Sequence, residues 1–261
     1  MGRLLGLFLI FLACTVIAVP LAALPDIIKP AEEVGMARLE LVSEGLSQLV
    51  IFMLAAWLFA KFFTESPRQA LGLQAQRRHW LLGLVGAVTI LLLIPSIDWL
   101  TAWNESWVFG PLDDSMRKTA EELNDKTLWL LSPSTVGDLL LQILVMAAVP
   151  ALCEEMFFRG ALQPIIQSLV RNSHAGILLT ALVFSLAHGD MYGFLPRLLL
   201  GLLLGYLFWT TGSLAVSACA HFVNNAVFVA AGHYYNTGAF TFNPFEPVGL
   251  PLPPTLACTL D

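Results

Sequence analysis

The sequence predicts an all-α membrane protein that crosses the bilayer about seven times, with a polar site among its last four helices. Two features of the composition support this fold class: 57% of the 261 residues are hydrophobic, and only 12% are charged. Soluble domains are about half apolar and about a quarter charged. The excess is concentrated in long apolar runs, which is typical of transmembrane helices rather than of one large core.

Seven apolar segments are the predicted spans. They are residues 4–24, 45–63, 80–100, 137–153, 175–189, 195–210 and 213–231. The first run is compatible with a secretory signal peptide, but it continues through Leu24 and no small-x-small cleavage site follows it. We therefore expect an uncleaved first span. In the sixth segment, Gly201 and Gly205 have the GxxxG spacing that allows helices to approach closely.

These segments divide the chain into three regions. Residues 1–136 hold three predicted spans and end with an acidic surface loop at 104–135. Residues 137–231 hold the last four spans and the polar residues that we discuss below. Residues 232–261 form a tail with five prolines, so we expect an extended and partly disordered segment there.

Helical spacing also occurs inside the acidic loop. Met116, Ala120 and Leu123 recur at intervals of three and four residues. This pattern fits a short amphipathic helix on the membrane surface, and it equally fits a solvated helix within a loop.

Lysine and arginine in short loops predict the orientation of the chain. The loop 64–79 is basic, and 159–174 holds Arg159 and Arg171 with no acid. The segments 26–44 and 104–135 are mostly acidic. We therefore expect the N-terminus in the cytoplasm and the C-terminus outside.

Charge and cysteine usage argue against two kinds of function. The net charge is −6, which gives no indication of nucleic-acid binding. Four cysteines, with no CxxC spacing among them, predict neither a disulfide framework nor a cysteine metal site.

The apolar run that ends at Cys153 is followed at once by Glu154 and Glu155, and then by Arg159. Each charge at the centre of a membrane helix costs roughly 2.5–3.5 kcal/mol, so such groups need a partner, a wet cavity or a function. Glu155 and Arg159 are four residues apart and can form a structural ion pair on one helix face. Glu154 lies about 100° round the helix without a local partner, so we expect a functional role for it.

Further polar residues occur in later spans, and we expect one cavity built by spans four to seven with the early helices as a casing. His188 follows Phe184 by four residues, and His221 shares a face with Asn225, next to Asn224. Singly, such residues are compatible with hydrogen bonds between packed helices. Together with a free acid they predict peptide hydrolysis, in which the carboxylate activates water, one histidine assists, and the other histidine and the amide stabilise an oxyanion.

Other proteolytic mechanisms are poorly supported. The sequence has no HExxH motif for a zinc site and no GxSxG motif for a nucleophilic serine. Asp138 and Asp190 do not lie mid-span, as a pair of catalytic aspartates would.

Three motifs together resemble those of the CPBP family, which comprises CAAX prenyl proteases and bacteriocin-processing or self-immunity membrane proteins. The motifs are Glu154-Glu155-x-x-x-Arg159, Phe184-x-x-x-His188 and His221-x-x-x-Asn225. The flanking residues 157–163, 193–197 and 221–225 are similar to the bacterial branch. The resemblance covers about residues 137–230, and its specificity lies in the order and spacing of the motifs.

The resemblance implies an intramembrane endopeptidase that cuts a membrane-associated or lipidated protein or peptide, in a bacterial plasma (inner) membrane. Carried over by position, Glu154 is the base assisted by His188, His221 and Asn225 stabilise the oxyanion, and Glu155 with Arg159 holds the helix. Expected partners are the lipid bilayer and a protein or peptide substrate.

A metal requirement and two other functions stay open. Family members have been labelled metalloproteases, but a glutamate mechanism needs no metal, and the histidines and acids lack a diagnostic zinc spacing. We therefore expect no obligatory cofactor. A non-catalytic membrane scaffold or bacteriocin-immunity protein could retain the motifs for packing. A proton-coupled transporter is disfavoured because the sequence has no evident inverted repeat.

Overall fold

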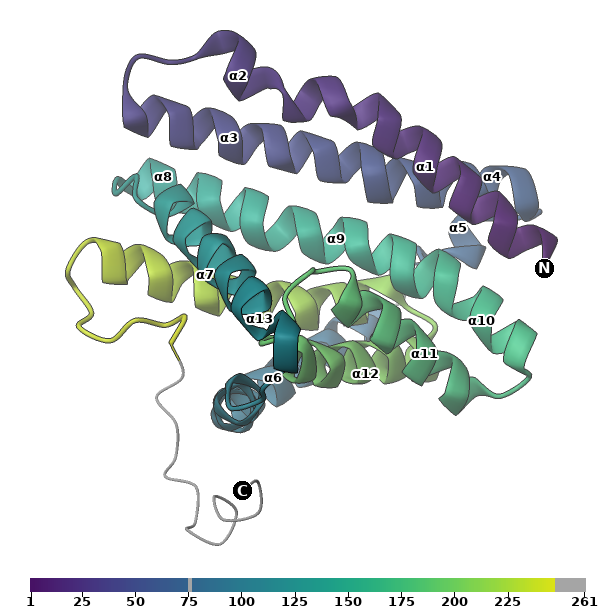
Figure 1. Ribbon diagram of the computed structural model, residues 1–261. Helices are drawn as coiled ribbons and strands as arrows, with labels where there is room; N and C mark the ends of the chain where they lie inside the picture. Colours follow the sequence, from purple (N-terminus) through teal and green to yellow (C-terminus); the bar gives the residue numbers. More distant parts are fainter. Residues whose placement is uncertain (75–76, 247–261) are drawn as a thin grey trace, which may run out of the picture.

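The computed structural model describes residues 1–74 and 77–246, and these residues form helices joined by short connections, with no strand among them (Figure 1). In chain order the helices are α1 (Gly2–Ala22), α2 (Leu24–Ile28), α3 (Glu33–Gln48), α4 (Ala55–Phe63), α5 (Pro67–Ala70), α6 (Arg77–Glu105), α7 (Asp113–Leu130), α8 (Val136–Gln142), α9 (Val149–Glu155), α10 (Gln163–Val170), α11 (Ser173–Leu186), α12 (Phe194–Thr211) and α13 (Leu214–Asn236). Three π-helical turns make α3–α4 and α8–α9–α10 continuous: Leu49–Leu54, Ile143–Ala148 and Met156–Leu162.

The prediction of an all-α polytopic membrane protein is confirmed. Six helical segments of the described chain are long and apolar enough to cross a bilayer: Gly2–Ile28, Glu33–Phe63, His79–Glu105, Val136–Val170, Phe194–Thr211 and Leu214–Asn236. The predicted fifth span corresponds to α11, which has only 14 residues. At about 1.5 Å per residue it is roughly 21 Å long, shorter than a hydrocarbon core of about 30 Å.

The acidic segment 26–44, expected as a loop, is largely helical, because most of it belongs to α3, which begins at Glu33. Its charged residues weakened the apolar signal from which the spans were predicted. The helix expected within 104–135 is present as α7. Of the tail, residues 232–236 complete α13, 237–246 form turns, and 247–261 lie outside the described residues.

Local sequence signals explain several helix ends. The side chain of Asn172 accepts a hydrogen bond from the backbone N–H of Ala175 and thereby caps the start of α11. Thr135 and Asp138 form a reciprocal capping box at the start of α8. Gly212 ends α12 in the left-handed conformation, with φ of 64°.

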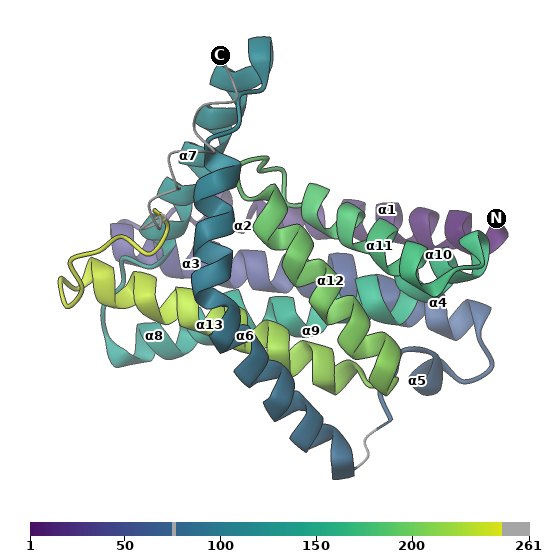
Figure 2. The same ribbon diagram turned by 90° about the horizontal axis from the view of Figure 1, so that it is seen from below.

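The helices pack in layers around the long α8–α9–α10 segment. In Figure 1, α1 and α3 lie side by side on one face of this segment, and α11, α12 and α13 lie on the other. Figure 2 shows α6 crossing α13 at a steep angle and running alongside α12. The residues that follow Glu154 are therefore enclosed by helices on both sides.

Aromatic rings fix the segment that follows the two glutamates. Phe157 packs against Phe11 of α1 and Phe52 of the first π-helical turn, with ring centroids 5.1 and 5.5 Å apart. Phe158 packs edge-on against Phe184 of α11 at 5.2 Å. Aromatic pairs at such separations add about 0.5–1.5 kcal/mol beyond the buried area. They hold the Met156–Leu162 turn from two sides and so set the rotation of the helix that carries the acids.

The GxxxG spacing in α12 allows a close approach to α11. A Cβ atom on Gly201 would lie 3.1 Å from the Cβ of Ala181 and 3.2 Å from its Cα, and one on Gly205 would lie 2.8 Å from a methyl group of Ile177. The expectation of close helix contact at these glycines is confirmed.

We predict that Gly201→Val lowers the free energy of unfolding by about 1–3 kcal/mol, because its side chain would push α12 away from α11. Thermal unfolding of the detergent-solubilised protein measures the change. Gly137→Val is the matched control, since a Cβ there meets only Thr135 Oγ1 at 3.7 Å. Equal unfolding temperatures for the two variants would contradict the close packing.

Candidate active site

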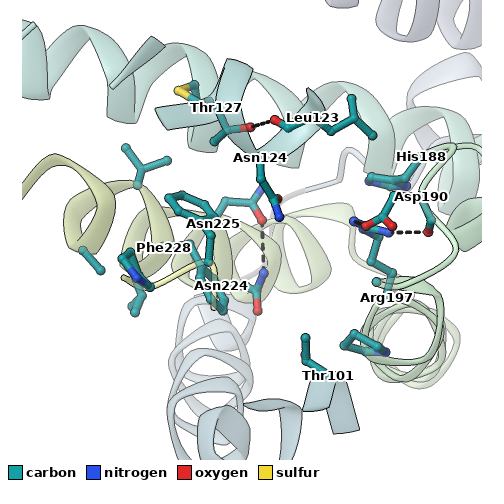
Figure 3. A pocket seen from close by; sticks show the side chains of 18 of the residues that line it. Thr101, Leu123, Asn124, Thr127, His188, Asp190, Arg197, Asn224, Asn225 and Phe228 are labelled. Atoms are coloured by element: carbon teal, nitrogen blue, oxygen red, sulfur yellow. Dashed lines mark hydrogen bonds and ion pairs between the residues drawn. The ribbon is translucent and has the colours of Figure 1, made fainter. Parts of the chain in front are cut away.

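A cavity of about 960 Å³ lies between the late helices, α6 and α7 (Figure 3). Its lining includes all four residues predicted to be catalytic: Glu154, His188, His221 and Asn225. Residues from α9, from the segment after α11 and from α13 therefore meet at one hollow. Their catalytic roles stay a prediction that this geometry permits.

The expectation that the early helices only encase the site is wrong. Glu44 and Gln48 of α3 and residues of α6 from Ile94 to Glu105 also line the cavity. They reach it because α6 crosses α13 and α3 packs against the π-helical turn before α9.

Helix α7 covers one side of this cavity. Its residues Leu123, Asn124 and Thr127 line the hollow, and Figure 3 shows Asn124 pointing toward the space that His188 and Asn225 also border. The acidic segment 104–135 thus contributes a wall of the site, which neither of the two interpretations of its helical spacing anticipated.

The carboxylate of Glu155 is the centre of a buried polar cluster. Its Oε1 atom lies 2.7 Å from Nη1 of Arg159 and 3.0 Å from Nδ1 of His221. The side chains of Glu155 and Arg159 are both 0% exposed, and that of His221 is 3% exposed. The ion pair expected from the i, i+4 spacing is present, and it also fixes a residue of α13.

Arg159 extends this cluster to the neighbouring helices. Its Nη2 donates a hydrogen bond to the carbonyl oxygen of Gly201 at 3.2 Å. Its guanidinium carbon lies 4.5 Å from the centroid of the Phe184 ring, a favourable cation–π geometry. One turn further on, Gln163 donates to the carbonyl of Gly205 at 3.1 Å. The absence of a side chain at both glycines leaves these carbonyls accessible.

Glu154 has a different environment from its neighbour. Successive helix residues are about 100° apart, so Glu154 faces the cavity when Glu155 faces Arg159. Its Oε2 atom is buried and has no hydrogen-bond partner among the described residues; Oε2 of Glu155 shares this state, but Oε1 of Glu155 contacts both Arg159 and His221. A buried polar atom without a partner is rare in native proteins and calls for a ligand, water or a function.

The hydrogen-bond acceptor next to each histidine sets the tautomer of its ring. Nδ1 of His188 lies 2.8 Å from the carbonyl oxygen of Phe184, and Nδ1 of His221 faces the Glu155 carboxylate. Carbonyl and carboxylate oxygens only accept, so both Nδ1 atoms carry the proton. Nε2 of each ring remains for contacts within the cavity. The Phe184 ring contacts both imidazoles, at centroid distances of 4.9 and 5.9 Å.

Two amides complete this end of the cavity. Nδ2 of Asn224 donates to Oδ1 of Asn225 at 3.1 Å (Figure 3). This bond occupies the oxygen of Asn225, so its NH₂ group is the part left to donate to a bound molecule.

The segment between α11 and α12 carries His188 and is held by polar contacts. Arg197 forms an ion pair with Asp190 at 2.5 Å and donates to its backbone carbonyl at 2.9 Å. The guanidinium lies against Gly193, where a Cβ atom would be 2.5 Å from it. Only glycine leaves room for Arg197 there.

A second contact joins this segment to α7. The hydroxyl of Tyr192 donates to Asp113, which also accepts from the backbone N–H of Phe109 and from Arg117. The Tyr192 hydroxyl, followed by the Phe109 N–H, lowers the pKa of Asp113 to about 2. Burial, together with the hydrogen bond to the carboxylate, raises the pKa of Tyr192 to about 12.

Sequence reasoning missed several residues that shape the site. The Glu155–His221 contact joins positions 66 apart, and the Asn104, Asp113 and Tyr192 contacts likewise connect distant segments. Helical spacing reveals neighbours on one helix and gives no signal for such pairs.

The described residues contain no group of three or more His, Cys, Asp or Glu side chains arranged to hold a metal ion. His188 and His221 both use Nδ1 for other contacts.

In a comparison with known protein families, the segment that contains the predicted catalytic residues matches one family model. Residues 136–227 match the family model described as Rce1-like, type II CAAX prenyl endopeptidase. No curated protein and no solved structure matches the chain. The matched segment runs from the start of α8 into α13, and it excludes α6 and α7.

We predict that Glu155→Gln destabilises the fold by about 3–5 kcal/mol, because it leaves the Arg159 charge buried without a carboxylate. Thermal unfolding in detergent checks this. The double variant Glu155→Leu, Arg159→Met should be more stable than Glu155→Gln, since it removes both charges. Glu122→Gln is the control, because its carboxylate is 68% exposed and lies 3.7 Å from Lys118. Wild-type unfolding behaviour of Glu155→Gln would contradict the assigned role.

We predict that Tyr192→Phe raises the pKa of Asp113 from about 2 toward its ordinary value of 3.8. A lowered folded-state pKa stabilises the fold above the ordinary pKa, and this contribution is lost as the pH falls through the folded-state pKa. The contact between α7 and the His188 segment should therefore be constant in neutral solution and weaken below about pH 4. Carboxyl carbon NMR titration measures the Asp113 pKa, and identical values in wild type and variant would refute the contact.

Proposed function

We propose that the protein hydrolyses a peptide bond of a membrane-associated or lipidated protein with a water molecule activated by Glu154, a proposal supported by the match of residues 136–227 to the Rce1-like family of type II CAAX prenyl endopeptidases. The observation that carries this proposal is the unpartnered, buried Oε2 of Glu154 at a cavity shared with two imidazoles and an amide.

The first step assigns roles to Glu154 and His188. The Glu154 carboxylate accepts a proton from water as the hydroxide attacks the carbonyl carbon of the substrate. The Nε2 lone pair of His188 accepts the other hydrogen of that water and orients it. Nδ1 is already bonded to the Phe184 carbonyl, so the ring has a fixed direction for this contact.

The second step concerns the oxyanion and the leaving group. The NH₂ group of Asn225 donates to the oxyanion. His221 donates from Nε2 when it carries a second proton, and the Glu155 carboxylate at Nδ1 balances that positive charge. Glu154 then returns its proton to the amine nitrogen as the peptide bond breaks.

The size and lining of the cavity support a peptide substrate. A volume of about 960 Å³ lies at the upper end of the usual range for ligand sites, about 300–1,000 Å³. Apolar residues of α6, α12 and α13, among them Ile94, Leu200 and Phe228, line part of it.

The scaffold alternative gives Glu154 a packing role, which requires a hydrogen-bond partner for it. Its buried Oε2 has none among residues 1–74 and 77–246. Hydrolysis therefore accounts better for this side chain.

Orientation and membrane type remain proposals. We propose a bacterial plasma membrane with a cytoplasmic N-terminus and, with α11 as a seventh crossing, an external C-terminus, based on the basic residues of the 64–79 and 159–174 segments. Arg159 no longer counts toward this argument, because it lies in a buried π-helical turn rather than in a loop.

We predict that Glu154→Gln abolishes cleavage and leaves the amount of folded protein in the membrane unchanged, because the amide keeps the shape but cannot take a proton from water. Comparative proteomics of membranes that contain the wild type or the variant should reveal fragments made only by the wild type. Glu122→Gln, on the outer face of α7, should retain them. Wild-type fragments in the Glu154→Gln membranes would exclude the mechanism.

A further inference from the structure

Asn104, near the end of α6, makes two hydrogen bonds to the segment that carries His188. Its Nδ2 donates to the backbone carbonyl of Met191 at 3.0 Å, and its Oδ1 accepts from the backbone N–H of Leu195 at 2.7 Å. The residue is 0% exposed. It does not line the cavity, and it lies outside the segment that matches the family model.

The two bonds act at both ends of the turn that leads into α12. Helix α11 ends at Leu186, the chain reverses through Gly189 with φ of 72°, and α12 begins at Phe194. His188 lies at the start of this connection, two residues beyond the end of α11, and its backbone N–H donates to the carbonyl of Ser185 at 3.3 Å. Asn104 thus links α6 to the Met191 carbonyl, which precedes α12, and to the Leu195 N–H in the first turn of α12.

We propose that Asn104 is a positioning residue that fixes the direction of the His188 ring through the connection between α11 and α12. Its bonds hold residues 191 and 195 in place, which keeps His188 where Nδ1 reaches the Phe184 carbonyl at 2.8 Å and Nε2 is left for the cavity. The catalytic consequence rests on the function proposed for Glu154 and His188.

The chemistry of the side chain explains why an asparagine is needed. An amide offers one donor and one acceptor in a fixed plane, which matches a carbonyl and an N–H. Aspartate keeps the acceptor for Leu195 but places a carboxylate oxygen against the Met191 carbonyl. Alanine removes the partner of the Leu195 N–H and leaves the Met191 carbonyl with only the long bond from the Phe194 N–H at 3.4 Å, which is costly.

Nitrogen NMR of protein labelled with ¹⁵N-histidine reports the ring tautomer directly, and the His188 signal is identified by its loss in His188→Gln. The wild type should show His188 protonated at Nδ1. In Asn104→Ala the ratio of the Nδ1–H to the Nε2–H form should fall by roughly tenfold, because the segment is released. Asn104→Asp should show the same change to a smaller extent, and it serves as the second variant if the alanine form does not fold.

Asn236→Ala is the matched control. Asn236 also donates to one backbone carbonyl, and its acceptor is Leu128 of α7, at 2.8 Å, rather than the connection between α11 and α12. The His188 signal of the Asn236→Ala variant should equal that of the wild type. A wild-type His188 protonated at Nε2, or an unchanged tautomer ratio in both Asn104 variants, would overturn the proposal.

The same variants separate this inference from the proposed function. If a substrate is cleaved, Asn104→Ala should lower kcat by about a hundredfold with little change in KM, since a displaced group affects the reaction more than binding. If the tautomer shifts but no membrane protein is cleaved by the wild type, the positioning role stands and the proteolytic function fails.

Discussion

The rest of the site depends on the carboxylate of Glu155, which binds a residue of its own helix and a residue of α13 through one oxygen atom. Arg159 lies 2.7 Å from this oxygen and His221 lies 3.0 Å from it, in a region closed to solvent. Removing any one member leaves a buried charge or donor without a partner, which is expensive in a membrane interior. The cluster therefore fixes the rotation of α9 relative to α13, and with it the direction of Glu154.

Two adjacent acids thus acquire different roles from helix geometry alone. The step of about 100° per residue sends Glu155 toward Arg159 and Glu154 toward the cavity. Phe157 and Phe158 follow directly and pack against α1 and α11, so the helix cannot rotate to exchange the two carboxylates. The glycines of α12 contribute by exposing carbonyls to Arg159 and Gln163. Glu155 therefore supports the structure, and its neighbour Glu154 is left for the proposed catalysis.

The sequence predicted the features that depend on local spacing or on composition. Long apolar runs predicted the helical spans, the i, i+4 interval predicted the Glu155–Arg159 pair, and GxxxG predicted the approach of α12 to α11. The sequence did not predict the features that depend on tertiary packing. The contact of Glu155 with His221, the wall formed by α7 and the role of Asn104 all join segments whose separation in sequence carries no periodic signal. The predicted span 175–189 runs past α11, because Ala187, His188 and Gly189 belong to the connection that follows Leu186.

The most direct test of this account compares the chemical reactivity of the two glutamates. A membrane-soluble carbodiimide, dicyclohexylcarbodiimide, modifies carboxyl groups within a bilayer when they are not engaged in an ion pair, and mass spectrometry of peptides locates the adduct. The account predicts an adduct on Glu154 and none on Glu155 in the folded protein, with both modified after denaturation. Modification of Glu155 at a rate equal to that of Glu154, or an inert Glu154, would contradict it.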